Sequence, residues 1–154
     1  MSSVLIVGHT DPSRLESSYA NAFTQLGWSV SRWNPDTEML ASVRGGRVGQ
    51  MLTAFVAVEP WVRKMNRKLV LDAMNLRPNL VLVFASAPVR VGALAQLRAS
   101  VDCSLVLVWP DTLVNWDTHL TAALPLYDLV ASYSQRTVDL LTPVSYTHLT
   151  LPTN

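Results

Sequence analysis

His9 is the residue of this chain best suited to acid–base chemistry, and it closely follows an apolar run that predicts a buried strand. An imidazole ordinarily has a pKa of about 6.5, so at neutral pH it can take a proton from a hydroxyl group. We therefore expect His9 to act as a catalytic base, with Thr10 and Asp11 on the same loop binding substrate. The alternative is a loop histidine hydrogen-bonded to Asp11 or to the backbone.

A second set of candidate side chains follows two later apolar runs. Asp111 could hold a proton or a sugar hydroxyl as a second catalytic residue, or it is an ordinary turn acid. Trp109 and Trp116 flank it and could stack on a sugar ring, although large aromatic side chains also build cores. Ser86 follows residues 80–84 and is a further candidate for substrate binding.

The sequence lacks the motifs of several common classes of enzyme and binding domain. Ser86 is not in a Gly-x-Ser-x-Gly sequence, which disfavours a serine hydrolase. The loop at residues 8–12 lacks the glycines of a dinucleotide site, and no Gly-Lys-Ser/Thr loop is present. Asp11 stands alone, without the acidic cluster of a phospho-receiver domain. His9 and His119 have no ligand spacing, so we predict neither a metal nor a cofactor.

The composition favours one domain that is not a nucleic-acid binder. The chain has 154 residues, 49% of them hydrophobic, and a net charge of +1, whereas a nucleic-acid footprint would be strongly basic. Cys103 is the single cysteine, which excludes an internal disulfide and fits a reducing compartment. No apolar run approaches the roughly 18 residues of a membrane span. We expect a cytoplasmic α/β domain.

Alternating strand and helix patterns position these side chains. Continuous apolar runs are typical of parallel strands covered on both faces, and they occur at residues 4–7, 80–84 and 105–109. An alternating segment at 28–33 suits an edge strand, and 127–132 is a weaker fifth strand. We predict a doubly wound, Rossmann-like parallel sheet of five strands in the order 2-1-3-4-5. Its crevice would lie between the loops after the first and third strands.

Helices are expected between the strands. Ser13 and Glu16 have the spacing of a capping box, and an apolar stripe follows until Gly27. The stripe consists of Leu15, Tyr19, Phe23 and Leu26. Further helices are predicted at 60–76, 91–100, 118–124 and 135–141, while 39–58 receives no assignment.

One predicted helix carries a basic stripe of four side chains, namely Arg63, Lys64, Arg67 and Lys68. A solvated helix face is the default interpretation. The alternative is peripheral contact with an anionic membrane surface, where each basic residue contributes roughly 1 kcal/mol.

Residues 144–154 match a translated sequencing adapter over ten residues, so we expect them to be a non-native tail. The natural domain would then comprise residues 1–143, and the native chain would continue past that point.

The order of these segments resembles the N-terminal half of a two-domain GT-B glycosyltransferase, closest to the spore-maturation, CgeB-like group. The matching pieces are residues 4–8, 18–23, 26–30, Asn66, 77–84, 109–111, 127–130 and Ser134. The resemblance spans most of residues 4–141, and no single motif in it is diagnostic.

The resemblance implies transfer of a sugar from a nucleotide-sugar donor to an unknown acceptor. It places this domain on the acceptor side and assigns the nucleotide to a C-terminal domain absent from this sequence, so the fragment alone would be inactive. Asp111 matches the group's aromatic-Pro-Asp segment, and His9 falls where some GT-B families place a base. The competing hypothesis is a non-catalytic α/β module that binds a ligand or partner.

Overall fold

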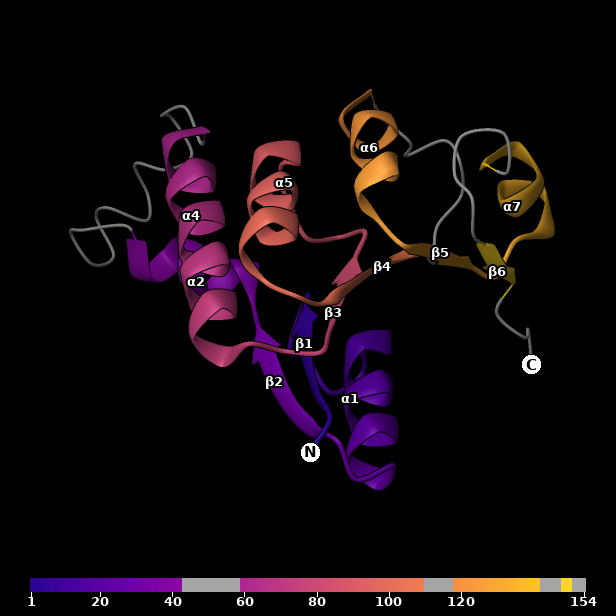
Figure 1. The fold of residues 1–154 in the computed structure, drawn as a ribbon, viewed down its shortest axis with the longest axis horizontal. Helices are drawn as coiled ribbons and strands as arrows, with labels where there is room; N and C mark the ends of the chain where they lie inside the picture. The colour runs from indigo at the N-terminus through magenta and orange to yellow at the C-terminus, as the bar shows by residue number, and fades with distance from the viewer. Residues whose placement is uncertain (43–58, 110–117, 142–147, 151–154) are drawn as a thin grey trace.

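The computed structural model describes residues 1–42, 59–109, 118–141 and 148–150 (Figure 1). Its strands are β1 (Ser3–Val7), β2 (Ser29–Trp33), β3 (Leu80–Phe84), β4 (Ser104–Trp109), β5 (Leu129–Ser132) and β6 (His148–Thr150). Its helices are α1 (Leu15–Gln25), α2 (Pro35–Ser42), α4 (Glu59–Leu76), α5 (Val91–Ser100), α6 (Thr118–Ala123), the 3-10 turn η2 (Leu124–Leu126) and α7 (Gln135–Leu141).

The described strands form one parallel sheet in the order β2-β1-β3-β4-β5-β6. This confirms the predicted α/β fold and the order 2-1-3-4-5 of its first five strands. The prediction lacks β6, which pairs with β5 and falls within residues 144–154. The sequence of that segment therefore supplies a strand in the structure, whatever its origin.

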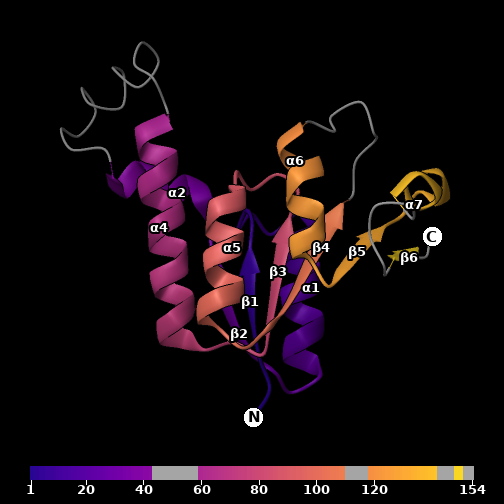
Figure 2. The ribbon, with the colours of Figure 1, turned by 45° about the horizontal axis from the view of Figure 1, so that its top comes forward.

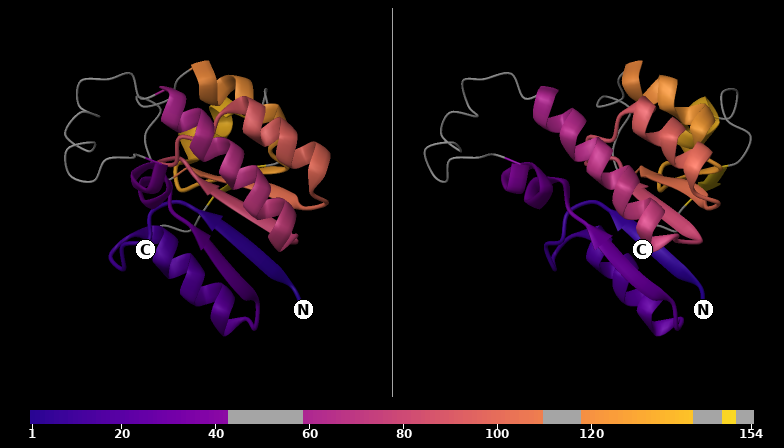
Figure 3. Two further views of the ribbon diagram at one scale, coloured as in Figure 1. Left: turned by 90° about the vertical axis from the view of Figure 1, so that its left-hand side faces the viewer. Right: turned by 60° about the vertical axis from the view of Figure 1, so that its left-hand side comes forward.

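Helices cover both faces of the sheet, as Figures 2 and 3 show. Helices α4, α5 and α6 lie on one face, and α1 lies on the other. Alternate strand residues point to opposite faces, so the core divides into two clusters. The larger cluster joins the sheet to α4, α5 and η2, and it includes Leu5, Leu69, Val83, Leu94, Leu107 and Leu124. The smaller cluster, beneath α1, includes Val4, Ile6, Ala20, Leu82, Phe84 and Val108.

The start of α1 differs from the prediction. Arg14 is the N-cap and makes no side-chain capping bond, while the hydroxyl of Ser13 donates to Asp11. The predicted capping box is therefore wrong, because the helix begins one residue late and leaves Glu16 free to turn toward the sheet. Leu26, which we predicted to lie on the apolar stripe of this helix, is 73% exposed.

Gly27 ends α1, as predicted. Its φ of 77° lies in the left-handed region that favours glycine. The N–H groups of Gly27 and Trp28 donate to the carbonyls of Thr24 and Phe23, each at 3.0 Å. These bonds satisfy carbonyl groups of the last helical turn and direct the chain into β2. Within the described part of the chain, no helix has both the length and the apolar character needed to cross a membrane.

Candidate functional site at the carboxyl edge of the sheet

The loops after β1, β2 and β3 leave the same edge of the sheet, because these three strands are parallel neighbours. Figure 2 shows the arrows of β1 and β3 ending together at that edge. From β1 the chain runs outward to β2, and the connection after β2 crosses back to β3 on the other side of β1. In open α/β sheets such a change of direction is where ligands bind.

His9 and Asp36 meet at this edge. Nδ1 of His9 lies 2.9 Å from Oδ2 of Asp36, and the His9 side chain is 21% exposed. Among the described residues, the partner of the His9 ring is thus Asp36, where the alternative interpretation had Asp11 or the backbone. A carboxylate at Nδ1 favours the tautomer with its proton there, which leaves Nε2 able to accept a proton.

Asn34 holds Asp36 in place. Its Oδ1 accepts a 2.9 Å hydrogen bond from the N–H of Asp36, and its backbone carbonyl accepts one from Glu38, so Asn34 caps α2. Pro35 then occupies the first helical position, where its missing N–H costs nothing. The amide of Asn34 also donates to the Thr10 hydroxyl at 2.8 Å. One side chain thus connects the β1 loop to the start of α2.

Glu16 is a buried carboxyl group beneath the same loop, with 4% of its surface exposed. Its Oε1 accepts hydrogen bonds from the His9 N–H at 3.2 Å and from the Ser86 hydroxyl at 3.3 Å. Ser86 follows β3, so Glu16 bridges the loops after β1 and β3. The carboxyl group thus occupies the His9 N–H in the loop after β1.

Arg32 and Asp11 support the β1 loop from outside. Arg32 donates to the His9 carbonyl at 3.3 Å and to the Ser17 hydroxyl at 2.8 Å. Asp11 accepts from the Ser13 hydroxyl and N–H, and these hydrogen bonds lower the pKa of Asp11. The carboxylate of Asp11 is therefore hydrogen-bonded within its own turn, and His9 acts on it only as a minor electrostatic influence.

The structure brings some of the predicted site residues together and separates others. His9, Thr10 and Ser86 lie at one edge, linked through Asp36, Asn34 and Glu16. Trp109 is only 2% exposed and belongs to the buried part of β4, so it presents no ring surface to a sugar. Its alternative interpretation as a core residue is the correct one. Asp111 and Trp116 lie outside the described residues.

The basic stripe on α4 is exposed, and two of its members have acidic partners. Nε of Arg63 lies 3.4 Å from Oε1 of Glu59, and Lys68 forms an ion pair with Glu38. The hydrogen bond to Glu38 raises the pKa of Lys68. These pairs lower the charge available to a membrane, and membrane contact stays a prediction.

Asp36, Asn34 and Glu16 are the site residues that sequence analysis missed. The segment Asn34-Pro35-Asp36 contains a helix start, with a capping residue followed by proline. Because β2 neighbours β1 in the predicted order, its following loop had to adjoin His9. Both signals were present in the sequence. Glu16 gave no such signal, since its spacing from Ser13 favours a helix cap.

No family model matches the chain, and no curated protein is significantly similar to it. Among the described residues, no group of three or more His, Cys, Asp or Glu side chains could hold a metal ion. The groups that the structure gathers at this edge are the His9 imidazole with Asp36 at its Nδ1, and the hydroxyl and amide groups of Thr10, Ser86 and Asn34.

Proposed function

We propose that this chain contains the acceptor-side domain of a two-domain glycosyltransferase, which moves a sugar from a nucleotide-sugar donor to an acceptor hydroxyl. The observation that carries the proposal is the 2.9 Å contact between His9 and Asp36 at the carboxyl edge of a parallel sheet. The resemblance of residues 4–141 to GT-B enzymes supplies the reaction class.

In this proposal His9 is the catalytic base and Asp36 is a positioning residue. Nε2 of His9 takes the proton of the acceptor hydroxyl while the oxygen forms its bond to the sugar. The bond between the sugar and the nucleotide phosphate breaks, and the nucleotide leaves with that bonding pair. Asp36 orients the imidazole and stabilises its cationic form, as a carboxylate does in other His–Asp pairs. In the same proposal Thr10 and Ser86 contact the acceptor.

The test uses the full-length gene product and measures release of nucleoside diphosphate from a panel of nucleotide sugars. His9→Gln should lower kcat by about 10² or more, since general-base catalysis contributes that much. Asp36→Asn should lower kcat by at least about tenfold, and the double variant should be no worse than His9→Gln alone. Asp102→Asn, which makes the same change at an exposed site, serves as the control.

A second readout separates positioning from simple structural damage. The nitrogen chemical shifts of His9 should report a proton on Nδ1 in the wild type, and Asp36→Asn should weaken that preference. If transfer by His9→Gln stays within about threefold of wild type, His9 is not the base. If no nucleotide sugar is turned over by the full-length protein, the non-catalytic binding module becomes the better interpretation.

A further inference from the structure

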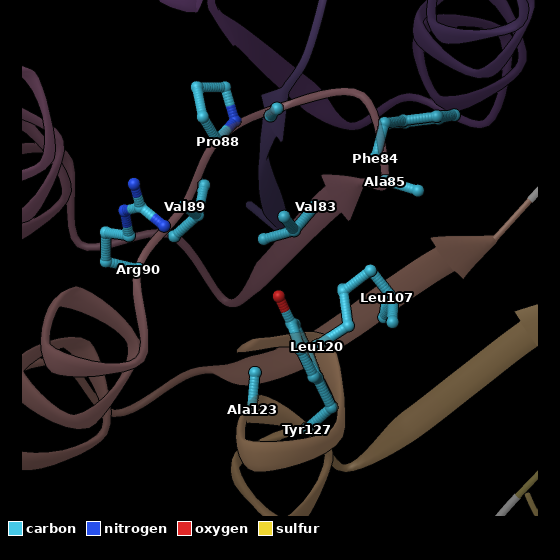
Figure 4. Close-up of a pocket in the computed structure, with 11 residues that line it drawn as sticks. Val83, Phe84, Ala85, Pro88, Val89, Arg90, Leu107, Leu120, Ala123 and Tyr127 are labelled. Atoms are coloured by element: carbon cyan, nitrogen blue, oxygen red, sulfur yellow. The ribbon is translucent and has the colours of Figure 1, made fainter. Parts of the chain in front are cut away.

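A pocket of about 170 Å³ lies beside the loop that follows β3, toward α5 and α6 (Figure 4). Its walls come from the ends of β3 and β4, the loop that follows β3, and the segment α6–η2. Most of the lining is aliphatic and includes Val83, Ala87, Val89, Leu107, Leu120 and Ala123. These walls favour an apolar occupant.

Tyr127 supplies one polar group of this pocket. The residue follows η2, where its N–H donates to the Leu124 carbonyl at 3.1 Å, and it is 7% exposed. Figure 4 shows its hydroxyl directed away from its own helical turn and toward Val83. Among the described residues the hydroxyl has no hydrogen-bond partner, and it is not one of the fully buried unpartnered atoms, so it is open to an acceptor within the pocket. Burial also raises the pKa of Tyr127, so the hydroxyl keeps its proton and can donate it.

Arg90 at the edge of the pocket decides the charge of the occupant. Its guanidinium is already paired with Glu59, with Nη2 and Oε2 2.8 Å apart. The ion pair carries no net charge, so a carboxylate ligand would meet no excess positive charge among these apolar walls, which is unfavourable. A neutral ligand avoids that cost. Within the part of the chain that the structure describes, Nε of Arg90 is buried without a hydrogen-bond partner and offers a donor to a neutral acceptor.

We propose that this pocket binds a neutral molecule about the size of one aromatic ring, with a hydrogen-bond acceptor that receives the Tyr127 hydroxyl. The size follows from the volume, because an apolar cavity of about 150 Å³ accommodates benzene. The selectivity follows from two hydrogen-bond donors beside largely aliphatic walls, namely the Tyr127 hydroxyl and the buried Nε of Arg90. The site is separate from the His9 edge and does not depend on the glycosyltransferase proposal.

The experiment titrates the 154-residue chain with two probes of nearly the same shape, acetophenone and α-methylstyrene, and follows backbone amide shifts by NMR. Only acetophenone carries the acceptor oxygen. Both should bind with dissociation constants of about 1 mM or tighter and shift amides of the lining residues. In Tyr127→Phe, the dissociation constant of acetophenone relative to that of α-methylstyrene should rise about three- to tenfold, as expected for one lost hydrogen bond.

Two further variants make the result decisive. Tyr133→Phe removes a hydroxyl from a residue that is 39% exposed and should leave that ratio unchanged. Val89→Trp fills the pocket and should weaken both probes. The proposal is overturned if neither probe binds saturably, if the shifted amides lie elsewhere, or if Tyr127→Phe leaves the ratio unchanged. Loss of folding in Tyr127→Phe would also contradict it, because the hydroxyl would then have a structural partner.

Discussion

Gly8 and Glu16 are packed so closely that a Cβ atom at position 8 would lie 2.8 Å from Cγ of Glu16. It would also lie 3.2 Å from Cβ of Phe84. Glycine at the end of β1 therefore creates the space into which the carboxyl group folds. The same space lets Glu16 reach both the His9 N–H and the Ser86 hydroxyl.

Gly8→Ala should destabilise the domain by about 1–3 kcal/mol, because the added methyl group overpacks a buried site. The free energy of unfolding from urea titration measures this effect. In a Glu16→Ala background the same substitution should cost less, since the nearest clashing atom is gone. If Gly8→Ala lowered the free energy of unfolding equally in the two backgrounds, Glu16 would not be the residue that limits the space at position 8.

The strands of this fold were predictable because burial on both faces leaves continuous apolar runs. Residues 80–84 coincide with β3, and the strand order followed from the alternation of strands with helices. Trp109 shows the limit of the same signal. It continues the apolar run of β4, and its large ring could equally have been exposed at a sugar site; only its 2% exposure settles that it belongs to the core.

The candidate site was less predictable because its key contacts join side chains far apart in sequence. His9 is 27 positions from Asp36, and Glu16 is 70 positions from Ser86. Helix α2, which carries Asp36, has weak apolar periodicity, so only its start signal identifies it. Strand order predicts which loops meet, but the side chains that pair across them depend on packing such as that of Gly8.

Asp128 ties together three elements, and its charge should make stability depend on pH. Its carboxylate accepts the Leu105 N–H of β4 at 2.7 Å and two hydrogen bonds from Arg98 of α5, at 2.9 and 2.7 Å. Burial alone would raise the pKa of Asp128, but the hydrogen bonds from Leu105 and Arg98 outweigh it and the pKa is lowered. The folded state therefore binds this proton less readily than the unfolded state.

Because the folded pKa is depressed, the stabilisation is present above the unfolded pKa of about 3.8 and is lost as the pH falls through the folded value. Asp128→Asn should cost about 1–2 kcal/mol at pH 7, a figure that allows for the partial exposure of the ion pair. As the pH falls through the folded pKa of Asp128, the difference should shrink toward zero. Urea unfolding across this range measures it, and Asp102→Asn is the control. A cost that does not vary with pH would mean that packing, and not charge, accounts for the contribution of Asp128.

Arg77 ends α4 in a conformation that arginine adopts at a cost. Its φ is 46°, and its N–H donates to the Ala73 carbonyl at 2.8 Å, with Pro78 following. This is a left-handed helix terminus, a position at which glycine is usual. A residue with a Cβ atom destabilises the folded state by roughly 1–2 kcal/mol in this backbone conformation. Glycine instead lowers stability by about 0.5–1 kcal/mol, because it gives the unfolded chain more conformational freedom. Arg77→Gly should therefore stabilise the domain by about 0.5–1 kcal/mol in urea unfolding.

Two companion variants show whether backbone conformation is the cause. Arg77→Ala removes the same charge and side-chain length but keeps a Cβ atom, so its stability should stay within about 0.5 kcal/mol of wild type. Gly27→Ala makes the reverse change at φ 77°, where an added Cβ would meet no atom within 4 Å, and should destabilise by about 1 kcal/mol. Steric contact is absent there among the described residues, so a loss at position 27 must come from the backbone. If Arg77→Gly and Arg77→Ala gave equal stability, the arginine side chain and not its φ would determine the effect.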